Sequence, residues 1–398
     1  MAKSNTNLAT TDAPKQSASH SASGAPAPTG ALKLVCDRTT LADALTLAGS
    51  VVASRSPAPA LLCVRLVAQG GTLRLQATDG ELGIALQLAS VEVSHEGESL
   101  VPVDKLLQIV RSCDDATLAL EADKHTLNVR GQHAKFRIFG YDPKLFPGIR
   151  DGEAATEFEV SAAQLRRMIT CTLFATSPDT SRYAVNGILL DRTARKLQMV
   201  ATDGRRLALA RGDCSGPADG DGSCVIPGKA MHVLQRLLDD PEATVKVTRE
   251  RTRASFAVGD SAVLSTALGE GAFPPYRDVI PKEHDKEAVF DAAELAAGVR
   301  RAALLTNEES KGVRFSFNKD GLTLISRAPE MGEAEIEVQL VSYSGDPIEV
   351  GFNPGYITDC LRISDSTEVH IEMRSPAKAA VVRFGADFTY VVMPVSTT

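Results

Sequence analysis

Two aspartates stand in the same short motif, and both are candidates for chemistry. Asp79 and Asp203 each lie between a threonine and a glycine. A carboxylate that recurs in this way could serve as a general acid, a general base or a metal ligand, but only if partner groups converge on it. No nucleophile–base pair or ligand set accompanies either one, and the third comparable position holds Arg327-Ala328. Thr-Asp-Gly is also a good β-turn sequence whatever its function, so we predict a protein that is not an enzyme and uses no cofactor.

Cysteine and histidine side chains offer no metal centre either. The seven cysteines are scattered, with no Cys-x-x-Cys pair and no Cys/His cluster at zinc spacing, and the seven histidines are equally dispersed. Cys214 and Cys224 flank a loop rich in Gly, Asp and Ser and would approach each other, but a disulfide there would be incidental in a reducing compartment. We therefore predict reduced thiols and no metal.

Net charge bears on possible partners. The formal charge is −7, whereas nucleic-acid binders usually carry a basic footprint. A ring escapes this objection, because its outside can be acidic while only its lumen is basic. The chain has no run of about 18 apolar residues and no secretory pattern at its start, so we expect a cytoplasmic protein.

The elements that must position these residues form an internal repeat. Three segments, beginning at Leu32, Thr156 and Ala288, each open with a short strand pattern, a polar helix-start residue and apolar residues at helical spacing. The helix-start residues are Asp37, Ser161 and Asp291.

Further features recur in the same order in each copy. A strand pair around a turn carries Thr78, Thr202 and Ser326, which follow one another at a spacing of 124 residues. A second helix pattern follows, in the segments that begin at Val101, Val225 and Gly351, and each copy is predicted to close on a strand and a proline. The closing pairs are Phe146-Pro147, Phe273-Pro274 and Met393-Pro394.

This period is too long for a solenoid, so each copy is predicted to be a whole α+β domain with two helices. Residues 1–30, rich in Ser, Ala, Thr and Pro, are predicted to be a disordered extension, because they have almost nothing to bury. The predicted domains are 31–153, 154–280 and 281–398. Three such domains suggest a pseudo-symmetric arc, and two arcs joined head to tail would close a ring.

At this point a family resemblance can be stated. The runs VATDGRRLAL from Val200, FPPYRDVIP from Phe273, RAALLTNEESKGVRF from Arg301, EVGFNPGYI from Glu349 and YVVMP from Tyr390 resemble the bacterial DNA polymerase III beta subunit, or sliding clamp, family. The likeness extends from about Leu32 to the end, with the motifs in the same order. It implies the DNA clamp fold, in which two helices per domain line a central hole, and a homodimer that encircles double-stranded DNA without sequence specificity. It also implies a loader, the polymerase III alpha subunit, other polymerases and repair proteins as partners, the clients binding through short peptides.

The resemblance assigns client peptides to a groove between the second and third domains. Small and aliphatic side chains suit an apolar slot, with a methionine as an adaptable wall. The implied groove residues are Val185, Thr202, Gly204, Arg205, Arg206, Leu207, Pro274, Val279, Asn353, Tyr356, Val391, Met393, Pro394 and Val395.

Basic side chains on the helices and adjoining loops are the candidates for phosphate contact, which carries no sequence information and suits a protein that slides. Arg55 and Tyr183 match positions that contact DNA in the family. The complete set predicted to bind DNA is Arg55, Tyr183, Arg182, Lys229, Lys105 and Arg166.

The implied dimer interface joins the first domain to the third domain of the other copy. It comprises Phe136 and Ile138 on a first-domain strand, with Leu304 and Leu305 of the third domain. Any of the four could also be an ordinary core residue.

The chain departs from the usual family pattern at the rim of the groove. Arg205 stands where histidine is frequent, Asp278 where a basic residue is common, and the chain ends PVSTT. These changes alter the charge at the rim, so client preference would differ. A clamp-like adaptor that binds partners without encircling DNA is the alternative, because basic residues are sparse in the first predicted helix, Leu41–Ser54.

Overall fold

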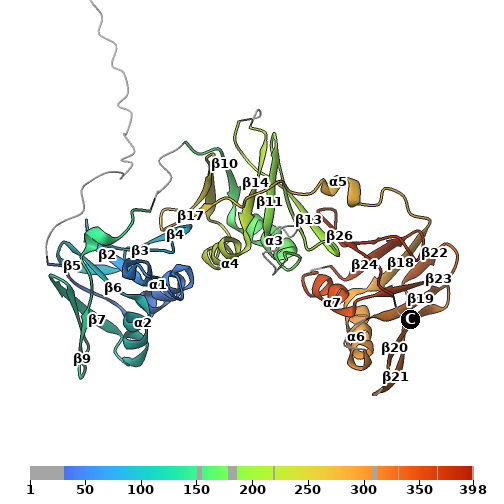
Figure 1. Ribbon diagram of the computed structural model, residues 1–398, viewed down its shortest axis with the longest axis horizontal. Helices are drawn as coiled ribbons and strands as arrows, with labels where there is room; N and C mark the ends of the chain where they lie inside the picture. The colour runs from blue at the N-terminus through green and yellow to red at the C-terminus, as the bar shows by residue number, and fades with distance from the viewer. Residues whose placement is uncertain are drawn as a thin grey trace, which may run out of the picture.

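The computed structural model describes residues 31–149, 155–177, 186–217, 220–306, 312–329, 331–364 and 366–396. Three units follow one another along an arc, and their helices lie on its inner, concave side (Figure 1). Each unit repeats the order strand, helix, four strands or five, helix, three strands. None of the helices in these ranges is long and apolar enough to cross a membrane. The predicted N-terminal extension, residues 1–30, lies outside the described residues.

The first unit runs from β1 to β9. Its helices are α1 (Arg38–Val51) and α2 (Val103–Ser112). Its strands are β1 (Lys33–Asp37), β2 (Cys63–Gln69), β3 (Thr72–Thr78), β4 (Leu82–Leu88), β5 (Val91–His95), β6 (Gly97–Pro102), β7 (Thr117–Asp123), β8 (Thr126–Arg130) and β9 (Lys135–Phe139).

The second unit runs from β10 to β17. Its helices are α3 (Ala162–Leu173) and α4 (Gly228–Leu237), and the short helix α5 (Tyr276–Val279) lies in the connection to the third unit. Its strands are β10 (Phe158–Ser161), β11 (Gly187–Thr193), β12 (Lys196–Thr202), β13 (Arg206–Asp213), β14 (Gly222–Pro227), β15 (Thr244–Arg249), β16 (Arg253–Val258) and β17 (Ala262–Ala267).

The third unit runs from β18 to β26, with helices α6 (Ala292–Ala302) and α7 (Pro354–Arg362). Its strands are β18 (Lys286–Asp291), β19 (Val313–Asn318), β20 (Gly321–Ala328), β21 (Gly332–Val338), β22 (Ser342–Ser344), β23 (Ile348–Phe352), β24 (Glu368–Met373), β25 (Ala380–Arg383) and β26 (Phe388–Val392).

The predicted helix starts are confirmed. Asp37 accepts a hydrogen bond from the amide of Thr40 at 2.7 Å, and Asp291 accepts one from the amide of Glu294 at 2.9 Å. Ser161 accepts a longer one, 3.3 Å, from the amide of Gln164. Each side chain satisfies an amide that the first helical turn leaves without a partner, which is why these residues begin the helices.

Sheets continue from one unit into the next. An eight-stranded sheet joins the first and second units where β4 pairs with β17, and we call this the first junction. A nine-stranded sheet joins the second and third units where β13 pairs with β26, the second junction. The five-stranded and four-stranded sheets at the two ends of the arc have β9 and β21, respectively, as edge strands. The units are therefore joined by backbone hydrogen bonds rather than only by side chains.

One repeat position is corrected by the strand pairing. Leu75, Met199 and Leu324 each face the core opposite the inward residue of the preceding strand. Two residues further, Ser326 corresponds to Ala201, so the residue equivalent to Thr202 is Arg327. Equivalent residues of the second and third units are therefore 125 positions apart rather than 124. An error of one residue matters because adjacent side chains of a strand point to opposite faces of the sheet.

The predicted closing strands are also partly wrong. Only Met393-Pro394 directly follows a strand. Phe146 follows the 3-10 turn η2 (Pro143–Leu145), and Phe273 lies in the connection after β17. Both phenylalanines pack on the outer face of a sheet, where the connection between units covers it.

Candidate partner-binding groove and DNA-facing surface

The Thr-Asp-Gly motif of the second unit forms a tight turn between β12 and β13. Asp203 Oδ1 accepts hydrogen bonds from the amides of Arg205 and Arg206, each at 3.0 Å. Thr202 Oγ1 donates to the carbonyl of Arg206 at 2.7 Å, and Gly204 has a positive φ of 84°. The same network closes the turn at Asp79, so both carboxylates are occupied in holding a turn.

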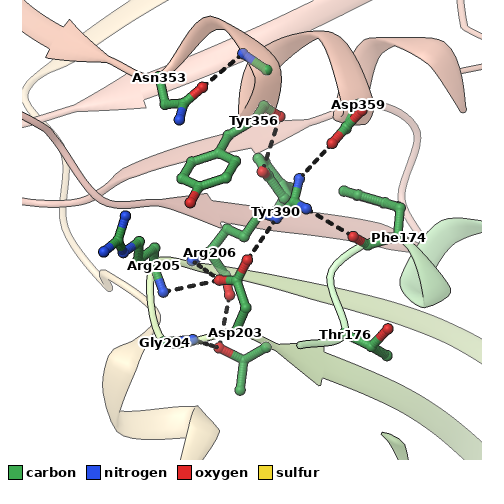
Figure 2. Close-up of polar contacts among 12 residues, drawn as sticks. Phe174, Thr176, Asp203, Gly204, Arg205, Arg206, Asn353, Tyr356, Asp359 and Tyr390 are labelled. Carbon is green, nitrogen blue, oxygen red and sulfur yellow. Dashed lines mark hydrogen bonds and ion pairs between the residues drawn. The ribbon is translucent and has the colours of Figure 1, made fainter. Parts of the chain in front are cut away.

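Arg206 joins the second unit to the third (Figure 2). Its guanidinium binds Asp203 at 3.0 Å and Asp359 of α7 at 2.8 Å, and it donates to the carbonyl of Phe174 at 2.9 Å. It also lies over the ring of Tyr356, 4.6 Å from the centroid.

The environment of Arg206 keeps it charged. Burial alone would lower the pKa of its guanidinium, but the hydrogen bond to Asp359 and the charge of Asp203 outweigh burial and raise the pKa above its ordinary value. Its side chain is only 10% exposed, and each of its three guanidinium nitrogens donates a hydrogen bond within the chain. Arg206 therefore links the two units across the second junction, and the contact with client peptides that the resemblance implies for it stays a prediction.

An apolar cluster on the outer face of the second junction, the face opposite the helices, would form the floor of the predicted groove. Leu207 of β13 pairs with Val391 of β26, which brings side chains 184 positions apart in sequence together. The cluster members are Leu189, Val200, Leu207, Leu209, Val225, Tyr276 and Val391, with Phe273, Ile280 and Ala379 packed against them.

Exposed apolar side chains stand at the rim of this floor. Met393 is 40% exposed and Val279 is 48% exposed, and both line an open pocket of about 470 Å³ on the third unit. The amide of Met393 donates to the carbonyl of Arg205 at 2.9 Å, and that of Val395 donates to the carbonyl of Gly351 at 2.8 Å. These bonds hold the C-terminal segment against the turn and against β23.

Other predicted groove residues are distributed around these features. Asn353 caps α7 by accepting a hydrogen bond from the amide of Gly355 at 2.9 Å, and Tyr356 is half-buried one turn further. Pro274 lines a neighbouring pocket of about 730 Å³ next to Tyr276. Pro394 is half-buried in the segment after β26, and Val185 lies outside the described residues.

Sequence reasoning missed part of the floor. Leu189, Val200, Leu209 and Tyr276 were not among the predicted residues. The alternation of strand side chains could have found two of them: if Leu207 points outward, so does Leu209, and the residue paired with Leu209 is Val200.

Tyr276 is anchored by polar contacts on the same face. Its hydroxyl lies within hydrogen-bond distance of two acceptors, Asp191 at 2.9 Å and Gln198 at 2.8 Å, and Arg277 binds Asp191 at 3.1 Å. Burial, followed by the hydrogen bond to Asp191, raises the pKa of this hydroxyl, which therefore stays protonated and donating. These contacts hold the connection that contains α5 against the second unit.

The six residues predicted to face DNA differ in exposure and in their contacts. Arg55 and Lys105 are exposed, after α1 and on α2 respectively. Arg166 is half-exposed on α3 and donates to the carbonyl of Leu238 at 3.1 Å. Arg182 and Tyr183 lie outside the described residues.

Lys229 lies at the first junction. Its ammonium donates to Asp79 at 2.6 Å and to the carbonyl of Val51 at 2.9 Å, so it ties α4 to the first unit. The side chain remains 48% exposed. Like Arg206 at the second junction, it pairs with the aspartate of a Thr-Asp-Gly turn, and its role in DNA binding stays a prediction.

The four predicted interface residues lie at the two ends of the arc, where β9 and β21 are found (Figure 1). Leu304 is 76% exposed and Leu305 is half-buried in the turn after α6. Ile138 is buried and Phe136 partly buried, because both point into the core of the first unit.

All seven cysteines are free and buried. Burial raises the pKa of Cys36 to about 12 and that of Cys224 to about 11. No group of three potential metal-binding side chains occurs among the described residues.

Comparison with protein families finds three consecutive matches. Residues 32–150 match the DNA polymerase III beta subunit N-terminal domain, residues 159–275 the central domain, and residues 277–396 the C-terminal domain. The Beta sliding clamp of Pseudomonas putida is 32% identical over 360 residues, which cover 90% of this chain and 98% of that protein. The Beta sliding clamp of Escherichia coli strain K12 is 30% identical over 369 residues, with 91% and 99% covered.

Solved structures are similar along the whole arc. The sliding clamp of Pseudomonas aeruginosa bound to griselimycin has a TM-score of 0.86 at 30% identity and covers 92% of this chain and 100% of that one. The DNA polymerase sliding clamp of Bacillus subtilis has a TM-score of 0.87 at 22% identity, with 93% and 100% covered, and this likeness concerns the fold.

Proposed function

Because this chain belongs to the DNA polymerase III beta subunit family, the beta sliding clamps, we propose that it is a non-catalytic ring that encircles duplex DNA and tethers a polymerase to it. The resemblance seen in the sequence is thereby confirmed at the level of family and fold. The observation that carries the ring is the pattern of strand pairing between units. Two junctions between units form within the chain. At each end of the arc, the strand that corresponds to a junction strand is an edge strand without a second neighbour.

The strand left at the start of the arc is β9. Phe136 faces Val129 of β8 just as Leu264 of β17 faces Phe256. Tyr390 of β26 holds the same position in the third unit. Since β17 and β26 each pair with the preceding unit, β9 is the strand that would pair with a third unit of another copy.

The strand left at the other end is β21. Ala334 faces Ser326 of β20 as Ile84 of β4 faces Ala77. Ala208 of β13 holds this position in the second unit. At the two closed junctions, Ile84 pairs with Leu264 and Ala208 pairs with Tyr390.

Carrying this register to the ends of the arc pairs Phe136 of one copy with Ala334 of the next. On the two sides of this pair, Arg137 faces Glu333 and Lys135 faces Glu335. Opposite charges directly across an antiparallel pair stabilise it by roughly 0.2–1 kcal/mol each, and like charges oppose it. An edge strand with alternating glutamates and an edge strand with alternating basic residues are therefore complementary.

Apolar surface supports the same contact. The turn that carries Leu304 and Leu305 packs beside β21, where a Cβ on Gly332 would lie 3.9 Å from Leu305 Cδ1. Pairing with β9 of a second copy would place the first unit over Leu304. Phe139, 74% exposed at the end of β9, would be covered in the same way.

Reversing the charge at Glu333 and Glu335 tests the ring. We expect Glu333→Lys with Glu335→Lys to be a monomer by light scattering at micromolar concentration, and to be lost from nicked circular DNA after loading. Adding Lys135→Glu and Arg137→Glu to the same chain restores complementary ends, so it should restore the dimer and retention. Linearising the circle should release both the wild-type protein and this fourfold variant, because a ring can slide off a free DNA end.

A first variant that stays dimeric and is retained would exclude this register. A wild-type dimer that is never retained on circles would instead favour the adaptor, which binds partners without encircling DNA.

The remaining expectations complete the proposal. The partner peptides of polymerases, loader and repair proteins would bind the groove residues named above, and Arg55, Lys105 and Arg166, with Arg182, Tyr183 and Lys229, would contact DNA phosphates. Domain limits at residues 31–153, 154–280 and 281–398 are supported by strands and helices that respect them. We place the protein in the cytoplasm, where the DNA is replicated.

A further inference from the structure

The open pocket of about 470 Å³ beside Met393 has two chemically different parts. Its apolar wall includes Val279, Ala379, Val381 and Met393. Val381 pairs with Val391 of the groove floor, so the pocket lies on the outer face and continues the floor onto the third unit. The helices lie on the opposite, concave side of the arc.

The polar part of the pocket contains carboxylates that are already neutralised. Glu372 accepts a hydrogen bond from Arg383 Nε at 2.8 Å and lies 3.6 Å from His284 Nδ1. Glu283 forms an ion pair with Arg374. Neither acid is therefore available to balance further positive charge.

Two lysines of the lining have exposed side chains. Lys282 lies in the connection after α5, and Lys378 lies in the turn between β24 and β25. Within the described residues, neither ammonium group has a hydrogen bond or an ion pair. Two separate segments thus present uncompensated positive charge beside an apolar wall.

We propose that this basic part of the pocket binds acidic side chains of the client peptide while the client's apolar anchor occupies the wall at Val279 and Met393. The inference rests on the proposed client groove and names the chemistry it selects. Carboxylates suit the site because Lys282 and Lys378 are exposed point charges that pair without being desolvated. DNA in the proposed ring would lie on the other face of the sheet, where its phosphates would not reach this pocket. An acidic protein segment is therefore the ligand that we propose.

Three synthetic peptides separate the contributions. All carry the same Leu-Phe anchor. One is flanked by serines, one has two aspartates before the anchor, and one has two aspartates after it. At about 50 mM salt, wild-type protein should bind at least one aspartate peptide about fivefold more tightly than the serine peptide, as two exposed ion pairs allow. This difference should shrink at about 0.5 M salt, because exposed charges are screened.

The variant Lys282→Gln with Lys378→Gln should lose the preference while binding the serine peptide within about twofold of wild type. A matched control, Lys246→Gln with Lys319→Gln, removes the same net charge from exposed positions elsewhere and should keep the preference.

The inference is overturned if wild type binds all three peptides equally, or if the preference survives in Lys282→Gln with Lys378→Gln. Either result leaves the groove intact, because the serine peptide still binds. If no peptide binds wild type, the groove assignment is wrong and the inference falls with it.

Discussion

The two closed junctions share a backbone and differ in what their outer faces carry. At the second junction, Leu207 pairs with Val391, and both belong to the apolar floor. The equivalent pair at the first junction is Gly83 with Ser265. A Cβ on Gly83 would lie 3.1 Å from Ile149 Cγ2, so the connection after the first unit fills the space that a ligand would need.

The difference continues on the neighbouring strands. Leu189 and Val200 of the second unit correspond to Arg65 and Gln76 of the first. Arg65 binds Glu98 at 2.6 Å and donates to Gln76 at 3.3 Å, so this face is polar and satisfied. The clamp fold alone therefore does not create the apolar floor that we assign to the proposed client groove. The proposed groove depends on which residues occupy one face of five strands, β11, β12, β13, β14 and β26.

The ionic contacts across the junctions also differ. The first junction has Lys229 bound to Asp79, with the lysine side chain 48% exposed. The second has Arg206 between Asp203 and Asp359, with the arginine side chain 10% exposed. The partly buried, forked contact of Arg206 should stabilise the fold more than the exposed ion pair of Lys229, because water screens the exposed pair more strongly.

The largest effect is expected at the rim of the groove. Met393→Asp places a carboxylate beside the apolar floor and should weaken binding of an anchor peptide at least about 100-fold, because an unpaired charge would be buried under the ligand. Ala267→Asp, at the equivalent position of the first junction, should leave affinity within about twofold. Calorimetric titration of both variants measures the difference, with light scattering to verify that each remains dimeric. Equal losses in the two variants would contradict the assignment of the groove to the second junction.

The ionic contacts should differ in stability by an intermediate amount. Arg206→Met leaves Asp203 and Asp359 without their shared partner in a largely buried site, and should lower the free energy of unfolding by about 3 kcal/mol. Lys229→Met removes an exposed pair and should cost less than about 1 kcal/mol. Urea unfolding followed by circular dichroism compares them. If Lys229→Met is the more damaging, the first junction is held more tightly than its exposure implies.

The smallest effect concerns two buried thiols, Cys63 of β2 in the first unit and Cys224 of β14 in the second. Burial raises the pKa of Cys63 and of Cys224 to about 11, so in the folded protein both remain protonated at pH 8. Because only the thiolate reacts, labelling should accelerate about tenfold per pH unit up to about pH 11, whereas in urea it should level off near pH 9. Cys224, which lines the 730 Å³ pocket, should react before Cys63, which is enclosed with Phe146. Mass spectrometry identifies the labelled site, and the reverse order would show that the outer face of the first unit is covered less tightly than that of the second.

The sequence by itself determined the repeat, the helix starts and the family. Asp37, Ser161 and Asp291 act locally, through amides two or three residues away, so their roles can be recognised without a fold. The Thr-Asp-Gly turns are local in the same way. The alternation of apolar residues along each strand can also be seen in the sequence. The sequence does not show which face of the sheet other parts of the chain cover.

Tertiary structure alone decided the features that depend on distant pairing. Lys229 finds Asp79 across 150 positions, and Arg206 finds Asp359 across 153, so neither lysine nor arginine reveals its partner in the sequence. The register of β20 was decided by its pairing with β19, which moved the repeat by one residue and turned Ser326 inward. Leu207 belongs to the floor of the proposed groove because β26 pairs with β13 and places Val391 beside it. Backbone pairing between units brings these groups together, and a side chain acquires its function from the neighbours that this pairing supplies.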